Sequence, residues 1–514
     1  MSPRDATLPS EDEPSPDGRR FLFLQGPISP FFAEVGAGLA ARGHVVHRIN
    51  LSLGDRLFWK QVPGTPAALD YSGRPAEWPG FVARYLDRHR ITDIVLLGEQ
   101  RECHRAAIEA AQARGIAVTV TDFGYFRPDW ITLERDAMGG ASRFPRDRAA
   151  IRALASGLPR ADLTERLKDD FPRQARWDVL YHLANLLPWP FPHYRSHHLH
   201  HPLVTYGGIG LRLLRRGAER AHGARVLERV QGQPYWLFAM QMETDFSIRA
   251  YSTYADMDTP VGEAVRSFAQ HAPADGQLIV KVHPLDPCLK RWGRRVPAIA
   301  ATAGVAQRVH VVHHGALDAM LAGSRGLVTV NSTVGLRAVM LDRPAKALGR
   351  AVWDVPGLVH QGPLDAFWTE GAPPEPELRE DFLAALQAAT QLRGVFYGEA
   401  GRALAVAGTV DRLHGGTVGV PAGPVSATVR RRPAPSAAPA GPRAGPPVWG
   451  GLWARHRNLP CRSGPVDDRS RCVACRCRGA AGRDAGRRPA RCHAGRGCRD
   501  GESPLRGQAA AGLR

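Results

Sequence analysis

Two short apolar runs of this sequence end in side chains that commonly bind phosphate or transfer protons, one at 278–287 and one at 328–335. Imidazole and ammonium groups donate hydrogen bonds to phosphate oxygens, and hydroxyls at a helix start accompany N–H groups that attract anions. We therefore expect both runs to contact the phosphate and sugar of a nucleotide-sugar donor. The residues concerned are Lys281, His283 and Pro284 after the first run, and Asn331, Ser332 and Thr333 after the second.

A second group of candidates is acidic and follows apolar runs nearer the N-terminus. Glu99 follows the run 93–98, and Asp122 follows the run 115–121. Sugar transfer with retention commonly uses a carboxylate nucleophile, so Asp122 and Glu99 are the predicted catalytic acids, together with His283 as a proton donor. A helix cap or an ion pair with a nearby arginine is the alternative role for each carboxylate. No Asp-x-Asp pair follows a strand, so we expect no metal and no cofactor besides the donor.

Strands alternating with helices would position these residues. The pattern repeats in two blocks, which predicts an α/β protein with two Rossmann-like domains facing a cleft, the GT-B plan. Ligands bind beyond the carboxyl ends of such strands, although no Gly-x-Gly-x-x-Gly motif implies a dinucleotide. Further candidates at these ends are Gln241 and Asp245 on the donor side, and Gln25, Gly26, Arg127 and Glu134 on the acceptor side.

The domain boundaries follow from the same pattern and from composition. Between the two blocks lies a region of helical spacing without repeated strands. The predicted boundaries are 1–19 for a disordered N-terminus, 20–146 for an N-terminal acceptor domain, 147–230 for a helical connector, 231–415 for a C-terminal donor domain and 416–514 for a disordered Arg/Gly/Pro/Cys-rich tail.

The net charge of +19 is concentrated in that tail, where residues 421–514 contain 19 arginines, no lysine and five acidic residues. The rest of the chain is only mildly basic, which argues against a nucleic-acid-binding protein. The tail lacks the apolar residues needed to fold. A shifted reading frame in a GC-rich gene is our hypothesis for its origin, and zinc binding by its cysteines is the alternative.

The connector raises two further questions. One is whether a metal site or a polar turn is formed by His197, His198, His200 and His201.

The other concerns the membrane. No apolar run is long enough to span a membrane, and no signal peptide is evident, so we expect a cytoplasmic protein, peripheral at the inner face of the membrane. Side chains that would contact an anionic bilayer, or else form a solvated helix face, are Trp189, Phe191, Tyr194, Arg212, Arg215 and Arg216.

Several of these segments together resemble one known family, the bacterial capsular polysaccharide export proteins of the KpsS and LipB type, which are retaining β-Kdo transferases. The resemblance runs over residues 21–413. The segments that carry it are FLQGP at 23–27, GYFRPDWITLE at 124–134, QMETD at 241–245, KVHPLDP at 281–287, VNSTVG at 330–335 and GLVHQG at 357–362.

The resemblance implies transfer of Kdo from CMP-Kdo to a phosphatidylglycerol-type lipid, which starts the oligo-Kdo linker of capsular polysaccharide and precedes export. His283 and the Ser332–Thr333 pair would hold the CMP moiety. Members of the family often carry two adjacent acids before the glycine, whereas this chain has Asp122, Phe123 and Gly124. The alternatives are a non-catalytic glycolipid-binding factor of the capsule assembly and export machinery, or a GT-B enzyme that uses another nucleotide sugar.

Overall fold

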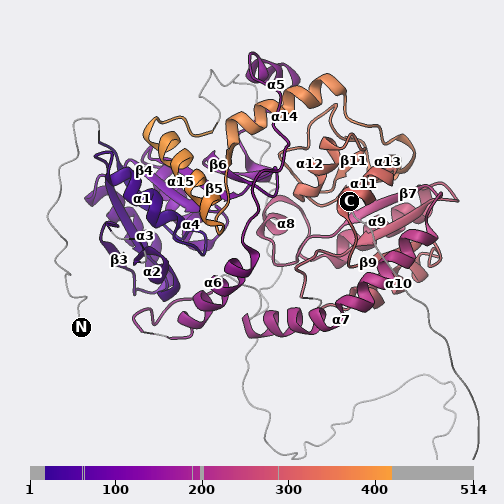
Figure 1. Ribbon diagram of the computed structural model, residues 1–514, viewed down its shortest axis with the longest axis horizontal. Helices are drawn as coiled ribbons and strands as arrows, with labels where there is room; N and C mark the ends of the chain where they lie inside the picture. Colours follow the sequence, from indigo (N-terminus) through magenta and orange to yellow (C-terminus); the bar gives the residue numbers. More distant parts are fainter. Residues whose placement is uncertain are drawn as a thin grey trace, which may run out of the picture. The chain divides into compact units, whose positions relative to one another are not determined.

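The computed structural model describes residues 18–60, 62, 64–187, 189–196, 202–287 and 289–419. The four-histidine cluster, most of the predicted N-terminal extension, and the tail beyond residue 419 lie outside these ranges, and so do the interpretations based on them. The described chain is built on two open sheets with helices on both faces of each (Figure 1).

The first sheet has seven strands in the order β12-β6-β5-β4-β1-β2-β3, and β1 to β5 pair in parallel. Along β1, Phe21 and Phe23 pack under α1, while Leu22 and Leu24 pack under α3 and α4, as the alternation of side chains requires. The strands are β1 (Arg20–Phe23), β2 (Val45–Asn50), β3 (Ala68–Asp70), β4 (Asp93–Leu97), β5 (Ala117–Phe123), β6 (Trp130–Arg135) and β12 (Gln391–Arg393). The helices are α1 (Phe31–Ala40), α2 (Leu53–Lys60), η1 (Pro75–Glu77), α3 (Trp78–Arg88) and α4 (Glu102–Gln112).

The second sheet is entirely parallel, with the order β11-β10-β7-β8-β9. Its strands are apolar on both faces, which is typical of a parallel sheet covered by helices on each side. The strands are β7 (Tyr235–Ala239), β8 (Gln277–Lys281), β9 (Val309–Val312), β10 (Gly326–Thr329) and β11 (Ala345–Ala347). The helices are α8 (Phe246–Tyr251), α9 (Asp258–His271), α10 (Trp292–Thr302), α11 (Leu317–Gly323), α12 (Thr333–Met340) and α13 (Leu364–Glu370).

The parallel strands of the two sheets follow the same order, which confirms the predicted pair of Rossmann-like folds on the GT-B plan. The order reverses between β1 and β4 in the first sheet, and between β7 and β10 in the second. Ligands of doubly wound sheets bind at such reversal points, beyond the carboxyl ends of the strands. Gln25 and Glu99 follow β1 and β4, and Gln241 and Asn331 follow β7 and β10.

The connector is helical, as predicted, and contains α5 (Arg148–Ala155), α6 (Phe171–Ala184) and α7 (Pro202–Arg229). The short helix η2 (Gly139–Ala141) precedes it, within the predicted N-terminal domain. The chain later returns to the first sheet through α14 (Pro376–Thr390), β12 and α15 (Glu399–His414). Strand β12 pairs antiparallel with β6, and α15 lies against α1 (Figure 1).

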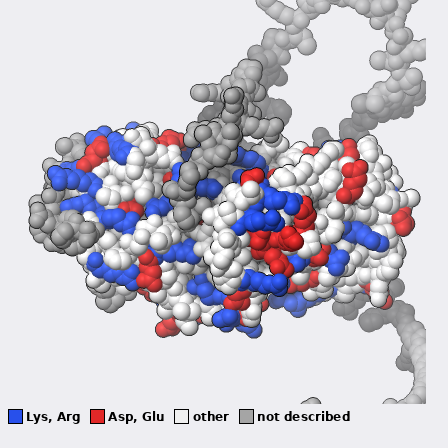
Figure 2. Space-filling view, turned by 90° about the horizontal axis from the view of Figure 1, so that it is seen from above, with Lys and Arg blue, Asp and Glu red and all other residues white. Residues whose placement is uncertain are grey.

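Oppositely charged side chains pair over α5 and α14, where Figure 2 shows blue and red side chains interleaved. Arg152 contacts Glu377 at 3.2 Å and Asp381 at 3.4 Å. Exposed pairs of this kind contribute little stability each, since water screens them. They leave this face without a strong net charge.

One predicted position in the first sheet is wrong. We expected Glu134 at the carboxyl edge, beside Glu99 and Asp122. Strand β6 runs antiparallel to β5, so Glu134 pairs with Val120 in the interior of the sheet. Its carboxylate is buried and accepts hydrogen bonds from the hydroxyls of Tyr125 and Ser142.

Candidate active site

The strand ends at the reversal point of the second sheet are tied together by side-chain hydrogen bonds. Gln241 donates to Asn331 at 2.9 Å and accepts from the Asn331 backbone N–H at 3.0 Å. Asn331 also donates to the carbonyl of Ser247 at 2.8 Å. Asp245 caps α8 by accepting from the Ser247 N–H at 2.9 Å. The predicted residues Gln241, Asp245 and Asn331 therefore form one polar network at this edge.

Helix α12 begins at this network. Ser332 is its N-cap, and its hydroxyl accepts from the Val334 N–H at 3.2 Å. The Trp353 indole donates to the Ser332 carbonyl at 3.0 Å. A Cβ on Gly335 would come within 2.0 Å of the Trp353 ring, so glycine permits this close packing. Ser332 and Thr333 thus lie on a rigid helix start, whose positive dipole end favours an anion.

His283 lies two residues beyond β8, and its ring is partly buried. Nδ1 accepts a hydrogen bond from the Leu285 N–H at 3.1 Å, which assigns the proton of the neutral ring to Nε2. Burial, and then the charge of Arg127, lower its pKa to about 4. At neutral pH His283 is therefore an uncharged N–H donor, suited to a phosphate oxygen rather than to acid catalysis in the free protein.

Arg212 of α7 fixes the loop that carries His283. One guanidinium nitrogen donates to the carbonyls of His283 and Pro284 at 2.9 Å and of Asp286 at 2.8 Å. Arg212 is buried and contacts Glu219 at 3.4 Å. The interpretation of Arg212 as a membrane contact is wrong, since its side chain points into the protein; the same holds for Phe191, which is buried.

Lys281, the last residue of β8, is 7% exposed. No hydrogen-bond acceptor or carboxylate partner contacts its ammonium group within the described ranges. Burial and the charge of Arg212 lower its pKa. A buried amine without a counter-charge is costly, so Lys281 is suited to an anion that enters the site.

Asp122 is the last residue but one of β5 in the first sheet, where it is partly buried and accepts from the Phe123 N–H at 2.7 Å. Burial raises its pKa, whereas the positive charges of Arg127 and Arg101 oppose the rise. The charge of Asp245, from the donor-side network, also acts on it. Asp122 and the donor-side residues are thus within electrostatic reach of one another.

Arg127 is exposed to solvent, yet protein lies close enough on several sides that desolvation lowers its pKa. The charges of Asp122 and Asp245 oppose this shift. Its guanidinium lies over the Phe123 ring, 5.0 Å from the ring centre. The interaction with the Asp122 charge and the contact with Phe123 place this acceptor-side candidate near Asp122.

Glu99, the second carboxylate, is buried and bonded to the other half of the protein. The Tyr251 hydroxyl donates to it, and Gln100 donates to Tyr251 at 2.9 Å. Burial raises the pKa of Glu99 to about 7. Burial also raises the pKa of Glu134 to about 7.

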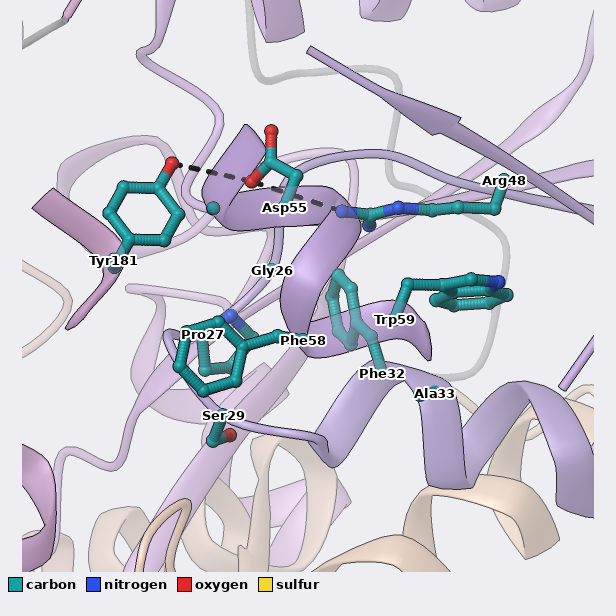
Figure 3. Close-up of a pocket in the computed structure, with 11 residues that line it drawn as sticks. Gly26, Pro27, Ser29, Phe32, Ala33, Arg48, Asp55, Phe58, Trp59 and Tyr181 are labelled. Carbon is teal, nitrogen blue, oxygen red and sulfur yellow. Dashed lines mark hydrogen bonds and ion pairs between the residues drawn. The ribbon is translucent and has the colours of Figure 1, made fainter. Parts of the chain in front are cut away.

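The remaining acceptor-side candidates, Gln25 and Gly26, adjoin a buried polar cluster of Arg48, Asp55 and Tyr181, which Figure 3 shows beside Gly26. Gln25 donates to Asp55 at 2.9 Å, and Tyr181 donates to the same carboxylate at 3.3 Å. Arg48 lies 3.9 Å from Asp55. Gly26 lines a cavity of about 10 Å³, which has room for about one water. A Cβ on Gly26 would lie 2.4 Å from the Phe32 ring, so close packing explains this glycine.

One acidic group could hold a cation, namely Glu243, Asp256 and Asp258. Lys290 already contacts Glu243, and its ammonium lies 2.5 Å from Asp258. Lys290, together with Arg295 at 2.6 Å from Asp258, therefore already pairs with two of the three carboxylates.

The chain is similar to known proteins over most of its described length. Residues 92–397 match the sequence profile of the family described as capsule polysaccharide biosynthesis protein. The chain is 29% identical to the capsule polysaccharide export protein KpsS of Escherichia coli, over 74% of this chain and 97% of that protein. It is 30% identical to the capsule polysaccharide modification protein LipB of Neisseria meningitidis serogroup A, over 74% of this chain and 91% of that protein. A solved structure of KpsC, beta Kdo 2,7 transferase, from Thermosulfurimonas dismutans superposes with a TM-score of 0.37 at 11% identity, covering 76% of this chain and 99% of that one. That likeness is too low to support an assignment.

Proposed function

Because the chain belongs to the family of capsule polysaccharide biosynthesis proteins, we propose that it is a glycosyltransferase that moves Kdo from CMP-Kdo to a phosphatidylglycerol-type lipid. The observation that carries the proposal is the pairing of two sites. A neutral His283 donor, a buried Lys281 and the start of α12 suit a phosphate on one side. On the other side, the partly buried carboxylate of Asp122 is acted on by the charge of Asp245, which belongs to the donor-side network.

The proposed reaction has two displacements. Asp122 attacks the anomeric carbon of Kdo, and the bond from that carbon to the phosphate oxygen of CMP breaks. CMP leaves with the electron pair and is stabilised by Lys281, by His283 Nε2–H and by the α12 N–H groups. An acceptor hydroxyl then replaces the Asp122 oxygen and gives up its proton. We assign that proton to Glu99, whose pKa of about 7 suits a general base.

Incubation with CMP-Kdo and a short-chain phosphatidylglycerol tests the proposal. Formation of CMP together with a new glycolipid is the expected result. Binding of the lipid without CMP release would instead favour a non-catalytic glycolipid-binding factor. Stabilisation against heat by UDP, but not by CMP, would favour an enzyme with another nucleotide sugar.

We also propose that α6, α7 and residues 185–187 and 189–196 form a face that contacts an anionic bilayer, consistent with the expected peripheral location. No described helix is long and apolar enough to cross a bilayer. Trp189 is 79% exposed and Leu214 is 85% exposed, and Arg215 and Arg216 follow directly. Exposed apolar side chains beside exposed arginines suit the interface of an anionic membrane. Other exposed apolar residues of this face are Val179, Leu180, Leu183, Leu186, Leu187, Val204, Leu211 and Leu213.

A further inference from the structure

A cavity of about 490 Å³ lies beside the reversal point of the first sheet. Its walls come from the segment before α3, the start of α4, residues 193–196 of the connector, and α8. Neither Asp122 nor any of Lys281, His283 and Asn331 lines it. The cavity is therefore separate from the donor-side network.

Four arginines line the cavity: Arg101, Arg105, Arg195 and Arg249. Within the described part of the chain, none of them pairs with a carboxylate, in contrast to the arginines over α5 and α14. Glu102 is the acidic residue among its lining side chains. Four guanidinium groups around one concavity with a single carboxylate attract an anion from outside, and guanidinium binds phosphate with two parallel hydrogen bonds.

The positions of two arginines are fixed by the surrounding structure. Arg101 donates to Gln25 at 3.5 Å, and its charge reaches Asp122. Arg249 donates to the Glu243 carbonyl at 3.0 Å and lies over the Phe246 ring. Arg105 and Arg195 are exposed and have no such contacts in the described chain. They are therefore free to approach a ligand.

The cavity also has an apolar part. Tyr71, Trp78, Tyr194 and Phe246 contribute rings to its lining. The wall at 193–196 begins four residues after Trp189, which belongs to the exposed apolar face. An anion with an apolar substituent fits this combination better than a free inorganic ion does. Gln100, next to the carboxylate Glu99, lines the cavity as well.

We propose that this cavity binds the phosphodiester headgroup of the acceptor lipid, with Arg105 and Arg195 on the phosphate oxygens and Arg101 between the headgroup and Asp122. The identity of the ligand as the acceptor rests on the function proposed above, whereas the recognition of a phosphodiester rests on the arginines themselves. Gln100, which lines the cavity, directly follows Glu99 in the chain, so the cavity adjoins the segment that carries the assigned general base.

Calorimetric binding of dihexanoyl-phosphatidylglycerol, below its micelle concentration, tests the site without any turnover. The variant R105Q/R195Q is expected to bind this lipid at least tenfold more weakly than the wild type, because it loses two charge-assisted hydrogen bonds. Arg294, an exposed arginine of α10 without an ion pair among the described residues, provides the matched control R294Q, which should bind as the wild type does. The affinity for CMP should be equal in all three proteins.

Further measurements separate the sources of the anion. Glycerophosphoglycerol, which lacks acyl chains, should compete with the lipid, and inorganic phosphate should compete at least tenfold less well. Wild-type affinity in R105Q/R195Q, no lipid binding by the wild type, displacement of the lipid by CMP, or equal competition by inorganic phosphate would each overturn the cavity assignment. Absence of turnover with CMP-Kdo, together with the expected loss of lipid binding, would refute the transferase function and leave the phosphodiester site standing.

Discussion

Replacing Arg212 by methionine is expected to weaken CMP binding even in protein that remains folded. Arg212 donates to three carbonyls of the loop that carries His283, at 2.8 to 2.9 Å, and contacts Glu219. A hydrogen bond from a charged donor contributes about 1.5–3 kcal/mol, and removing one member of a buried charged pair costs about 3–5 kcal/mol. Part of the loop is exposed, so water will replace some of these bonds. We expect a loss of about 3 kcal/mol in the free energy of unfolding.

The effect on the ligand follows from the same contacts. Without the guanidinium, the loop is free to move His283 Nε2–H away from the phosphate, and we expect the Kd for CMP to rise about tenfold, which is about 1.4 kcal/mol. Calorimetry with CMP and urea unfolding measure the two losses separately. Arg216→Met is the matched control, since Arg216 lies on the same helix but is exposed. Arg212→Lys should bind CMP as weakly as the methionine variant, because an ammonium group cannot span three carbonyls as a guanidinium does.

Two outcomes would refute this reasoning. A folded Arg212→Met protein with wild-type affinity for CMP would show that Arg212 stabilises α7 without positioning His283. An equal loss of CMP affinity in Arg216→Met would show that the general charge of α7 attracts CMP, and that the contacts to the loop are not the cause.

Three further predictions address the carboxylates and the membrane face. Asp122→Asn should lower kcat at least about 10³-fold with unchanged CMP affinity, and turnover near the wild-type rate would exclude Asp122 as the nucleophile. Glu134 keeps its proton in the folded protein up to a pKa of about 7, against an ordinary value of 4.5, so the wild type loses stability as the pH rises from 4.5 to 7. Urea unfolding of Glu134→Gln should lack this loss, which amounts to about 3 kcal/mol, and parallel pH profiles of the two proteins would contradict the assignment. The variant L213E/L214E should no longer float with anionic vesicles, whereas L404E, which replaces an exposed leucine of α15, should still do so. Flotation of L213E/L214E as well would show that α7 does not contact the membrane.

The sequence predicted those features that follow from strand direction and local pattern. Asn331 and Ser332 come after a buried run and before a helix, so their place at a sheet edge follows from chain direction alone. Glu134 was misplaced because the apolar alternation of 130–135 is the same in a parallel and an antiparallel strand. Arg212 was misread because the carbonyls of His283 and Pro284 that it contacts lie more than seventy residues away in the sequence. The spacing of arginines on α7 does not show which one is buried. Long-range contacts of this kind leave no local signal.

Position 123 carries Phe123 where members of the family often have a second acid, and contacts distant in sequence explain this difference. The same contacts bear on whether Asp122 or Glu99 is the nucleophile. Phe123 packs against Phe396 and Tyr397 of the segment that returns to the first sheet, and its ring supports the guanidinium of Arg127. An acid at position 123 would bury a charge among those rings. A nucleophile must be ionised, and Arg127 and Arg101 favour the ionised form of Asp122. Glu99 is half protonated near pH 7 and is bonded to Tyr251. Asp122 is therefore our preferred candidate for the nucleophile, and Phe123 contributes by supporting an arginine whose charge opposes the rise in the Asp122 pKa.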